Sequence, residues 1–272
     1  MIRDPAVSGL FYSDVPETLA ADVARYGDQA AVPEPAVALV SPHAGLMYSG
    51  HVAGAVYARV TVPATVILLG PNHSGNGPPV SVFREGTWLI PGWSADVDHE
   101  LADALLARFP QARDDVSAHR HEHCLEVQLP FLRKGNPNLR IVPIVLGHQP
   151  EDVYRELGLC LARMLDERRR KNPATVPLLV SSTDLSHYES DATTRAKDRH
   201  AIEAIRRLDP AGLGEAVRTH RITMCGYAPT VTVLHAARAL GSRSADLVRY
   251  ATSGDVSGDR SRVVGYAGLI IR

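Results

Sequence analysis

Two histidines in this chain follow short apolar runs that end in the same way. Residues 37–41 lead through a proline to His43, and residues 66–70 lead through a proline to His73. A short run rich in β-branched residues and closed by Gly or Pro is typical of a buried strand leaving a sheet. Ligands of open α/β sheets bind beyond the carboxyl ends of the strands. We therefore predict that His43 and His73 form half of a metal site.

A carboxylate and a further histidine follow another apolar run, residues 176–182. Asp184 is also explained by a turn or a helix cap, because Asp side chains bind nearby backbone N–H groups. A turn or a helix cap does not account for His187 in the same way. A carboxylate three residues from an imidazole can orient the ring or form a general acid/base pair with it. We therefore expect Asp184 and His187 to be candidate functional residues, with these roles left open.

Cys225 stands just before a predicted helix at residues 226–240. The positive end of a helix dipole lowers the pKa of a thiol, which favours a reactive or metal-binding cysteine. The alternative is an inert buried cysteine, since free cysteines are often buried. Three cysteines in 272 residues argue against a disulfide framework. Cys160 lies on an apolar helix face and is predicted to belong to the core.

Residues 119–124 contain three histidines and Cys124. Short His/Cys tracts can bind metal, but this spacing matches no structural zinc signature. We predict that most of the tract is solvated. His123 and Glu126 are the exceptions, because they lead into the apolar turn 129–132, and we expect both to line a substrate pocket.

Apolar periodicity predicts strands that alternate with helices. The predicted strands cover residues 36–41, 64–70, 79–90 (one or two strands), 141–146, 176–182, 247–252 and 263–271. The predicted helices cover residues 15–29, 49–59, 98–109, 126–132, 152–169, 194–208, 211–218 and 226–240. Residues 1–15 are expected to form an irregular arm. The alternation indicates an α/β fold, a three-layer α/β/α sandwich around a largely parallel, mixed sheet.

Length and composition restrict the class of protein. The chain of 272 residues lies near the size at which single cores stop growing, about 250–300 residues. No linker divides it, so we predict one domain, 1–272. The net charge of −1 gives no reason to expect a nucleic acid or an anionic membrane as partner. No apolar stretch approaches the ~20 residues that span a bilayer, and no signal-peptide core is present, so a cytoplasmic protein is expected.

The motifs of this chain resemble those of the Memo family, whose prokaryotic members are called AmmeMemoRadiSam system protein B. The resemblance follows nearly the whole chain in order. It is carried by Arg3-x-Pro5-x-Val7-x-Gly9-x-Phe11-Tyr12, Pro42-His43-Ala44-Gly45, Tyr48-Ser49-Gly50, Gly70-Pro71-Asn72-His73, residues 122–132 and 182–188, Cys225-Gly226, and residues 253–255 and 264–268. Cys124 stands where the family commonly has Ser, and it could compete as a second thiol near the pocket.

The resemblance implies a fold similar to that of class III extradiol dioxygenases, which hold non-haem Fe(II) through two histidines and a carboxylate. In Memo proteins the third ligand is implied to be a cysteine, so the implied metal ligands here are His43, His73 and Cys225. His187 matches the acid/base histidine of the dioxygenases, and Asp184 would line the same pocket. Fe(II) is the first expectation for the cofactor, with Cu or Zn as alternatives.

Three functions remain open. The first is a metal-dependent oxidoreductase of the Memo family that binds O₂ or a small aromatic or amide-like substrate. In this function His187 acts as acid/base, Asp184 orients it, and Tyr48 is a further pocket residue. The second is a zinc-dependent hydrolase at the same site, in which the metal lowers the pKa of a bound water and Asp184 or His187 is the base. The third is a non-catalytic module that binds a peptide or metabolite, in a complex with other proteins of the AmmeMemoRadiSam system. A homo-oligomer is compatible with all three.

Overall fold

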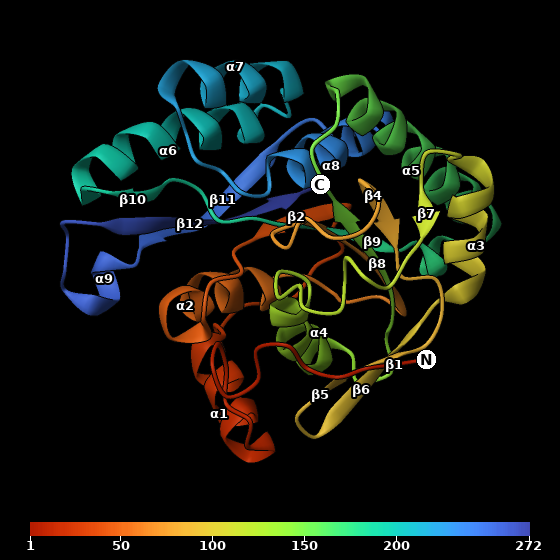
Figure 1. Cartoon of the computed structure of the whole chain (residues 1–272), viewed down its shortest axis with the longest axis horizontal. Coiled ribbons are helices and arrows are strands. Elements are labelled where there is room, and N and C mark those ends of the chain that lie inside the picture. The colour runs from red at the N-terminus through yellow and green to blue at the C-terminus, as the bar shows by residue number, and fades with distance from the viewer.

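The structure is built around one large mixed sheet (Figure 1). It is a computed structural model that describes residues 1–272. The strands are β1 (Ile2–Arg3), β2 (Ala38–Ser41), β3 (Thr65–Pro71), β4 (Val80–Val82), β5 (Thr87–Ile90), β6 (Trp93–Val97), β7 (Arg113–Asp114), β8 (Arg140–Leu146), β9 (Leu178–Ser182), β10 (His187–Glu189), β11 (Ala245–Thr252) and β12 (Val263–Ile271). The helices are α1 (Pro16–Tyr26), α2 (Leu46–Tyr57), α3 (His99–Arg108), α4 (Leu129–Gly135), α5 (Glu151–Lys171), α6 (Asp191–Arg206), α7 (Pro210–His220), α8 (Tyr227–Ala239) and α9 (Gly254–Ser257), with short 3-10 helices η1 (Glu126–Gln128) and η2 (Pro173–Thr175).

The middle of the sheet is parallel. The strands β8, β3, β9 and β2 are neighbours in that order and run the same way, so their carboxyl ends lie at one edge. On one side β12 pairs antiparallel with β2, and β11 and β10 pair with β12. On the other side β6 runs parallel to β8 and antiparallel to β5. The sheet is therefore parallel at its centre and mixed at its margins, as the sequence predicts.

Helices cover both faces of the sheet, because the central strands are apolar on both sides. Ile67 and Leu69 of β3 pack on one face with residues of α3, α5, α6, α7 and α8. Val66 and Leu68 pack on the other face with residues of α1, α2 and α4. Figure 1 shows these two layers of helices on either side of the sheet. The predicted three-layer α/β/α sandwich is confirmed.

Two local predictions are corrected by the structure. Helix α2 begins at Leu46 instead of residue 49, so Ser49 lies within the helix, where its hydroxyl donates to the Ala44 carbonyl (2.7 Å). The segment that follows the run 79–90 forms an additional strand, β6, which pairs with β5 through a turn at Gly92 (φ 71°). None of the helices combines the length and apolar composition that a bilayer crossing requires.

The N-terminal arm is held by one buried carboxylate, that of Glu126. It accepts hydrogen bonds from Arg3 Nη1 (2.7 Å), from the backbone N–H groups of Ala6 (2.7 Å) and Val7 (3.1 Å), and from the Tyr12 hydroxyl. Four donors compensate the cost of burying this charge. The prediction that Glu126 lines the substrate pocket is wrong, because its carboxylate is committed to the arm.

His119 is fully buried, although the sequence predicts a solvated tract around it. Its ring packs edge-on against Phe83 and Trp88, and neither ring nitrogen has a hydrogen-bond partner. Arg3 lies over the Trp88 ring, and its Nε donates to the His119 carbonyl (2.8 Å). Burial, together with the positive charge of Arg3, lowers the pKa of His119 to about 3. The neutral imidazole therefore serves as a core side chain.

We predict that replacing His119 with Phe makes the protein less sensitive to acid. In the unfolded chain His119 binds a proton below pH ~6.5, whereas the folded ring stays neutral down to about pH 3. His119 therefore lowers stability as the pH falls between these two values. Between pH 7.5 and 4.5, the free energy of unfolding of the wild type should fall about 3 kcal/mol more than that of His119→Phe, as measured by urea denaturation.

The exposed His121 in the same tract provides the control, and His121→Phe should leave the pH dependence unchanged. Parallel pH profiles for the wild type and His119→Phe would contradict the prediction.

Candidate metal centre

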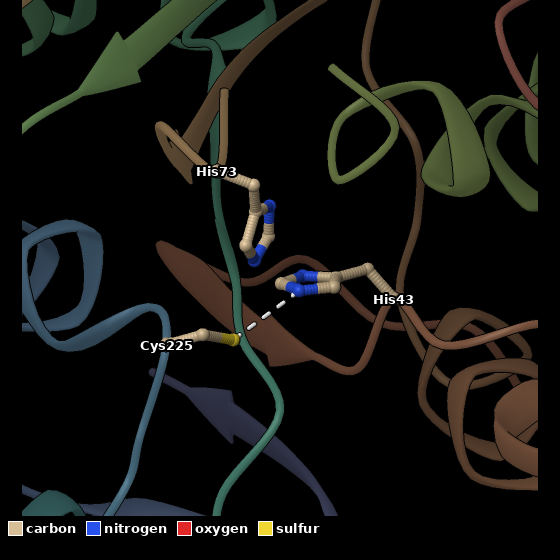
Figure 2. Close-up of side chains that lie close together, drawn as sticks. All are labelled: His43, His73 and Cys225. Carbon is tan, nitrogen blue, oxygen red and sulfur yellow. Dashed lines mark hydrogen bonds between the residues drawn. The ribbon is translucent and has the colours of Figure 1, made fainter. Parts of the chain in front are cut away.

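Three neighbouring strands each present one functional residue at the same position past their end. His73 lies two residues beyond β3, Asp184 two residues beyond β9, and His43 two residues beyond β2. Because β9 lies between the other two strands and all three are parallel, these residues meet at one edge of the sheet. Cys225 joins them from the loop that precedes α8 (Figure 2).

The side chains of His43, His73 and Cys225 point toward one another (Figure 2). Their possible ligand atoms all lie within 4.8 Å of one another, and Cys225 Sγ lies 3.2 Å from His43 Nε2. His43 is buried and Cys225 is half-buried, but His73 is more exposed, so the cluster opens on one side. Three protein ligands with an open side are typical of reactive metal sites. We call these three residues the metal centre, as the name of a candidate site.

A saturated hydrogen-bond network sets the tautomer of His43. Gln128 Nε2 donates to the Pro42 carbonyl and to Ser182 Oγ (both 2.9 Å), and the Ser182 hydroxyl donates to the Cys124 carbonyl (2.7 Å). The only hydroxyl proton of Ser182 is thereby used, so His43 Nδ1, 2.9 Å away, must donate to it. Burial lowers the pKa of His43 to about 3. The neutral ring therefore presents its Nε2 lone pair to the metal centre.

Glu122 sets the tautomer of His73 in the same way. Its Oε1 accepts from His73 Nδ1 (2.8 Å) and its Oε2 from the His73 backbone N–H (2.7 Å). Burial alone would raise the pKa of Glu122, but the hydrogen bonds that it accepts from His73 and from the Cys124 backbone N–H outweigh burial and lower the pKa to about 2. An ionised carboxylate only accepts hydrogen bonds, so His73 carries its proton on Nδ1 and directs Nε2 to the metal centre.

Asp184 and His187 both line the pocket, but no hydrogen bond joins their side chains. Asp184 Oδ1 accepts from the His43 backbone N–H (2.9 Å), and burial raises the pKa of Asp184. The His187 ring is oriented by Thr223, whose carbonyl accepts from Nδ1 (2.9 Å). The prediction that Asp184 orients His187 is corrected accordingly. His187 is left with Nε2 as the ring nitrogen that is free for a ligand.

The thiol of Cys225 does not have the lowered pKa that its place before α8 predicts. Burial and the nearby Asp184 carboxylate raise the pKa of Cys225, although the Asp184 backbone N–H donates to its Sγ (3.2 Å). Such a thiol gives up its proton when a metal ion takes the proton's place. Cys124 is fully buried, its Sγ donates to the Pro71 carbonyl (3.3 Å), and it does not line the pocket.

A pocket of about 590 Å³ opens onto the metal centre. His123 and Tyr48 are among the residues that line it. The His123 ring stacks on the His73 ring with 4.6 Å between centroids, and it meets Phe11 of the N-terminal arm edge-on at 4.9 Å. Burial lowers the pKa of His123 to about 4, so this ring is neutral at pH 7.

Four residues that position the site were not identified in the sequence, namely Glu122, Gln128, Ser182 and Thr223. Gln128 carries a usable signal, because it is a polar residue within the apolar segment 125–132 and a buried amide requires partners. Glu122 and Thr223 carry no local signal, since their role depends on histidines distant in the chain.

A three-layer α/β/α protein that gathers two histidines and a cysteine beyond its parallel strands belongs to the class of proteins with a candidate three-ligand metal site. The comparison with known families is more specific. The chain belongs to the Memo family, because the family model described as "Memo-like protein" matches residues 3–270.

The relatives are similar over their whole length. A MEMO1 family protein of Methanopyrus kandleri is 39% identical over 289 residues, which cover 100% of this chain and 99% of that protein. A MEMO1 family protein of Methanosarcina mazei is 40% identical, with 99% of each chain covered. The crystal structure of an uncharacterized protein from Escherichia coli K12 matches 85% of this chain and 98% of its own with a TM-score of 0.52. At 15% identity that likeness concerns the fold alone.

We predict that both His43 and His73 carry their proton on Nδ1 in the metal-free protein, which long-range ¹H–¹⁵N NMR spectra of histidine can measure. Ser182→Ala removes the acceptor of His43 Nδ1 and should give a mixture of His43 tautomers. His73 is the internal control, because Glu122 still holds its ring. An unchanged His43 pattern in Ser182→Ala would show that Ser182 does not set this tautomer.

Proposed function

We propose that this protein is a metal-dependent oxidoreductase, related in its chemistry to class III extradiol dioxygenases, with Fe(II) held by His43, His73 and Cys225. The observation that supports it most directly is the convergence of three ligand atoms within 4.8 Å beside an open pocket. The two histidines are already in the tautomer that metal ligation requires, which adds independent support.

The chemistry of the donor set fits a divalent or redox-active metal. Two imidazoles and a thiolate are softer than two imidazoles and a carboxylate, and they suit Fe, Cu(I) and Zn. Cu and Zn are therefore the alternatives to Fe(II). When bound, the metal would supply Lewis acidity or electron transfer to a substrate held beside it.

The residues around the metal centre can hold and move a proton. The Nδ1–H of His187 is engaged by Thr223, so Nε2 is the atom that would take a proton from a substrate or return it. Asp184 is buried and its pKa is raised, so its carboxyl group holds a proton more readily than an exposed one. We assign the acid/base role to His187. Asp184 lies beside it and positions the backbone of His43.

A zinc-dependent hydrolase is the second candidate. A Cys/His/His donor set with an open side also suits zinc, and His187 or Asp184 would then accept a proton from water. A non-catalytic module that binds a peptide or metabolite is the remaining alternative, and it would not require the metal centre.

We predict that Cys225→Ser weakens metal binding while the fold is kept. Wild-type protein purified without oxygen should contain about one metal ion per chain. In Cys225→Ser the affinity for Co(II) should fall at least ~10-fold, with loss of the thiolate-to-cobalt absorption band. Metal analysis and electronic spectra measure both. Cys124→Ser is the matched control, because Cys124 is a nearby thiol outside the pocket, and it should keep the band.

Each outcome separates the candidates. Full occupancy by zinc without a redox signature would favour the hydrolase and contradict the oxidoreductase. A protein that binds no metal, and whose ligand binding is unaffected by His43→Ala, would support the non-catalytic module.

A further inference from the structure

Several large apolar side chains that face solvent gather at the mouth of the pocket. Leu10 is 71% exposed and Tyr188 is 64% exposed, and Met47 and Tyr48 are exposed as well. All four line the pocket. Isolated exposed apolar residues need no explanation, but a group of them around a concave site marks a binding surface. We call these four residues the apolar mouth.

Tyr188, one of the residues of the apolar mouth, has an unfavourable backbone conformation. Its φ is 62°, in the left-handed region that bulky side chains rarely adopt. It sits at the irregularity between His187 and Glu189 where β10 pairs with β12. The Arg262 guanidinium lies over the Tyr188 ring, 5.6 Å from the ring centroid, and Arg262 does not line the pocket. Strain of this kind clusters at functional sites, and here the Tyr188 ring lies 5.7 Å from the His187 ring, centroid to centroid.

The N-terminal arm supplies a second, preorganised part of the wall. Leu10 and Phe11 line the pocket, and the Phe11 carbonyl accepts from the Leu46 N–H (2.7 Å) at the start of α2. Glu126 fixes the preceding residues of the arm. Because this part of the wall is already ordered in the free protein, ligand binding would cost little conformational entropy of the protein.

The charge of the lining restricts the ligand further. No Lys or Arg lines the pocket, and Asp184 is its only acidic residue. Phosphate and carboxylate groups are held in proteins chiefly by Arg, Lys or clustered N–H donors. A ligand with such groups on its body would lose hydration here, and no lysine or arginine would compensate for it.

We infer that the pocket takes a small molecule with an apolar body about the size of an aromatic ring and one compact polar head, and with no phosphate or further carboxylate group. The head reaches the metal centre, and the body rests on the apolar mouth. The volume of about 590 Å³ is within the range of small-molecule sites. This inference rests on the proposed function, because the head is taken to bind the metal.

Three hydroxamates with the same metal-binding head test the inference on Co(II)-loaded protein. Benzohydroxamate should bind at least ~10-fold more tightly than acetohydroxamate, because its ring is buried in the apolar mouth. A carboxylate at the para position of benzohydroxamate should remove this gain. Equal affinities for the first two, or tighter binding of the carboxylated compound, would overturn the inference.

Variants of the apolar mouth test whether these residues cause the difference in affinity between the hydroxamates. Leu10→Ser and Tyr188→Ser should each weaken benzohydroxamate binding about 3-fold or more, and acetohydroxamate reports whether the metal centre is intact in each variant. Val32→Ser is the matched control, since Val32 is 77% exposed but lies outside the pocket. A loss in Val32→Ser equal to that in Leu10→Ser would also count against the inference.

Metal content, measured first, separates this inference from the proposed function. If the protein takes up no metal, the proposed function fails, and the apolar mouth is tested on metal-free protein through the NMR signal of the Met47 methyl group. A shift with benzyl alcohol but not with inorganic phosphate would support the apolar ligand class. A shift with phosphate alone would overturn it.

Discussion

The register of three adjacent parallel strands determines where the proposed functional groups lie. β9 pairs with β3 through Leu69 and Ser181 and with β2 through Ser41 and Ser182. A slip of one residue would move the following side chain by about 3.3 Å and turn the strand over, whereas metal ligands tolerate deviations of about 0.2 Å. Apolar side chains on both faces of these strands oppose such a slip. The packing of the core is therefore also what positions the metal centre.

Strand register brings the rings together, but hydrogen bonds decide which atoms meet. The Ser182 hydroxyl and the Glu122 carboxylate each receive an Nδ1–H, one from His43 and the other from His73. Both rings then direct Nε2 toward the thiol of Cys225, and the cluster is organised before any ion arrives. The acceptors differ in charge, since one is a neutral hydroxyl and the other a carboxylate. A carboxylate acceptor raises the basicity of its histidine more than a hydroxyl does, so the two ligands are not equivalent.

The sequence predicted those features that depend on local pattern. Apolar runs and turn residues were sufficient for the central strands, for the helices around them and for the position of His43 and His73 past a strand end. The strand β6 was missed, because its pairing with β5 depends on a turn at Gly92 and not on its own composition. The burial of His119 and the role of Glu126 were misjudged for a related reason: both depend on Arg3, more than a hundred residues earlier in the chain.

The attachment of the N-terminal arm to Glu126 has a consequence for the order of assembly. The arm is synthesised before the carboxylate that secures it, which follows about 120 residues later in the chain. Until then the arm has no docking partner, and closing so long a loop is slow and entropically costly. The part of the pocket wall that Leu10 and Phe11 form is therefore completed only after the middle of the polypeptide has been synthesised.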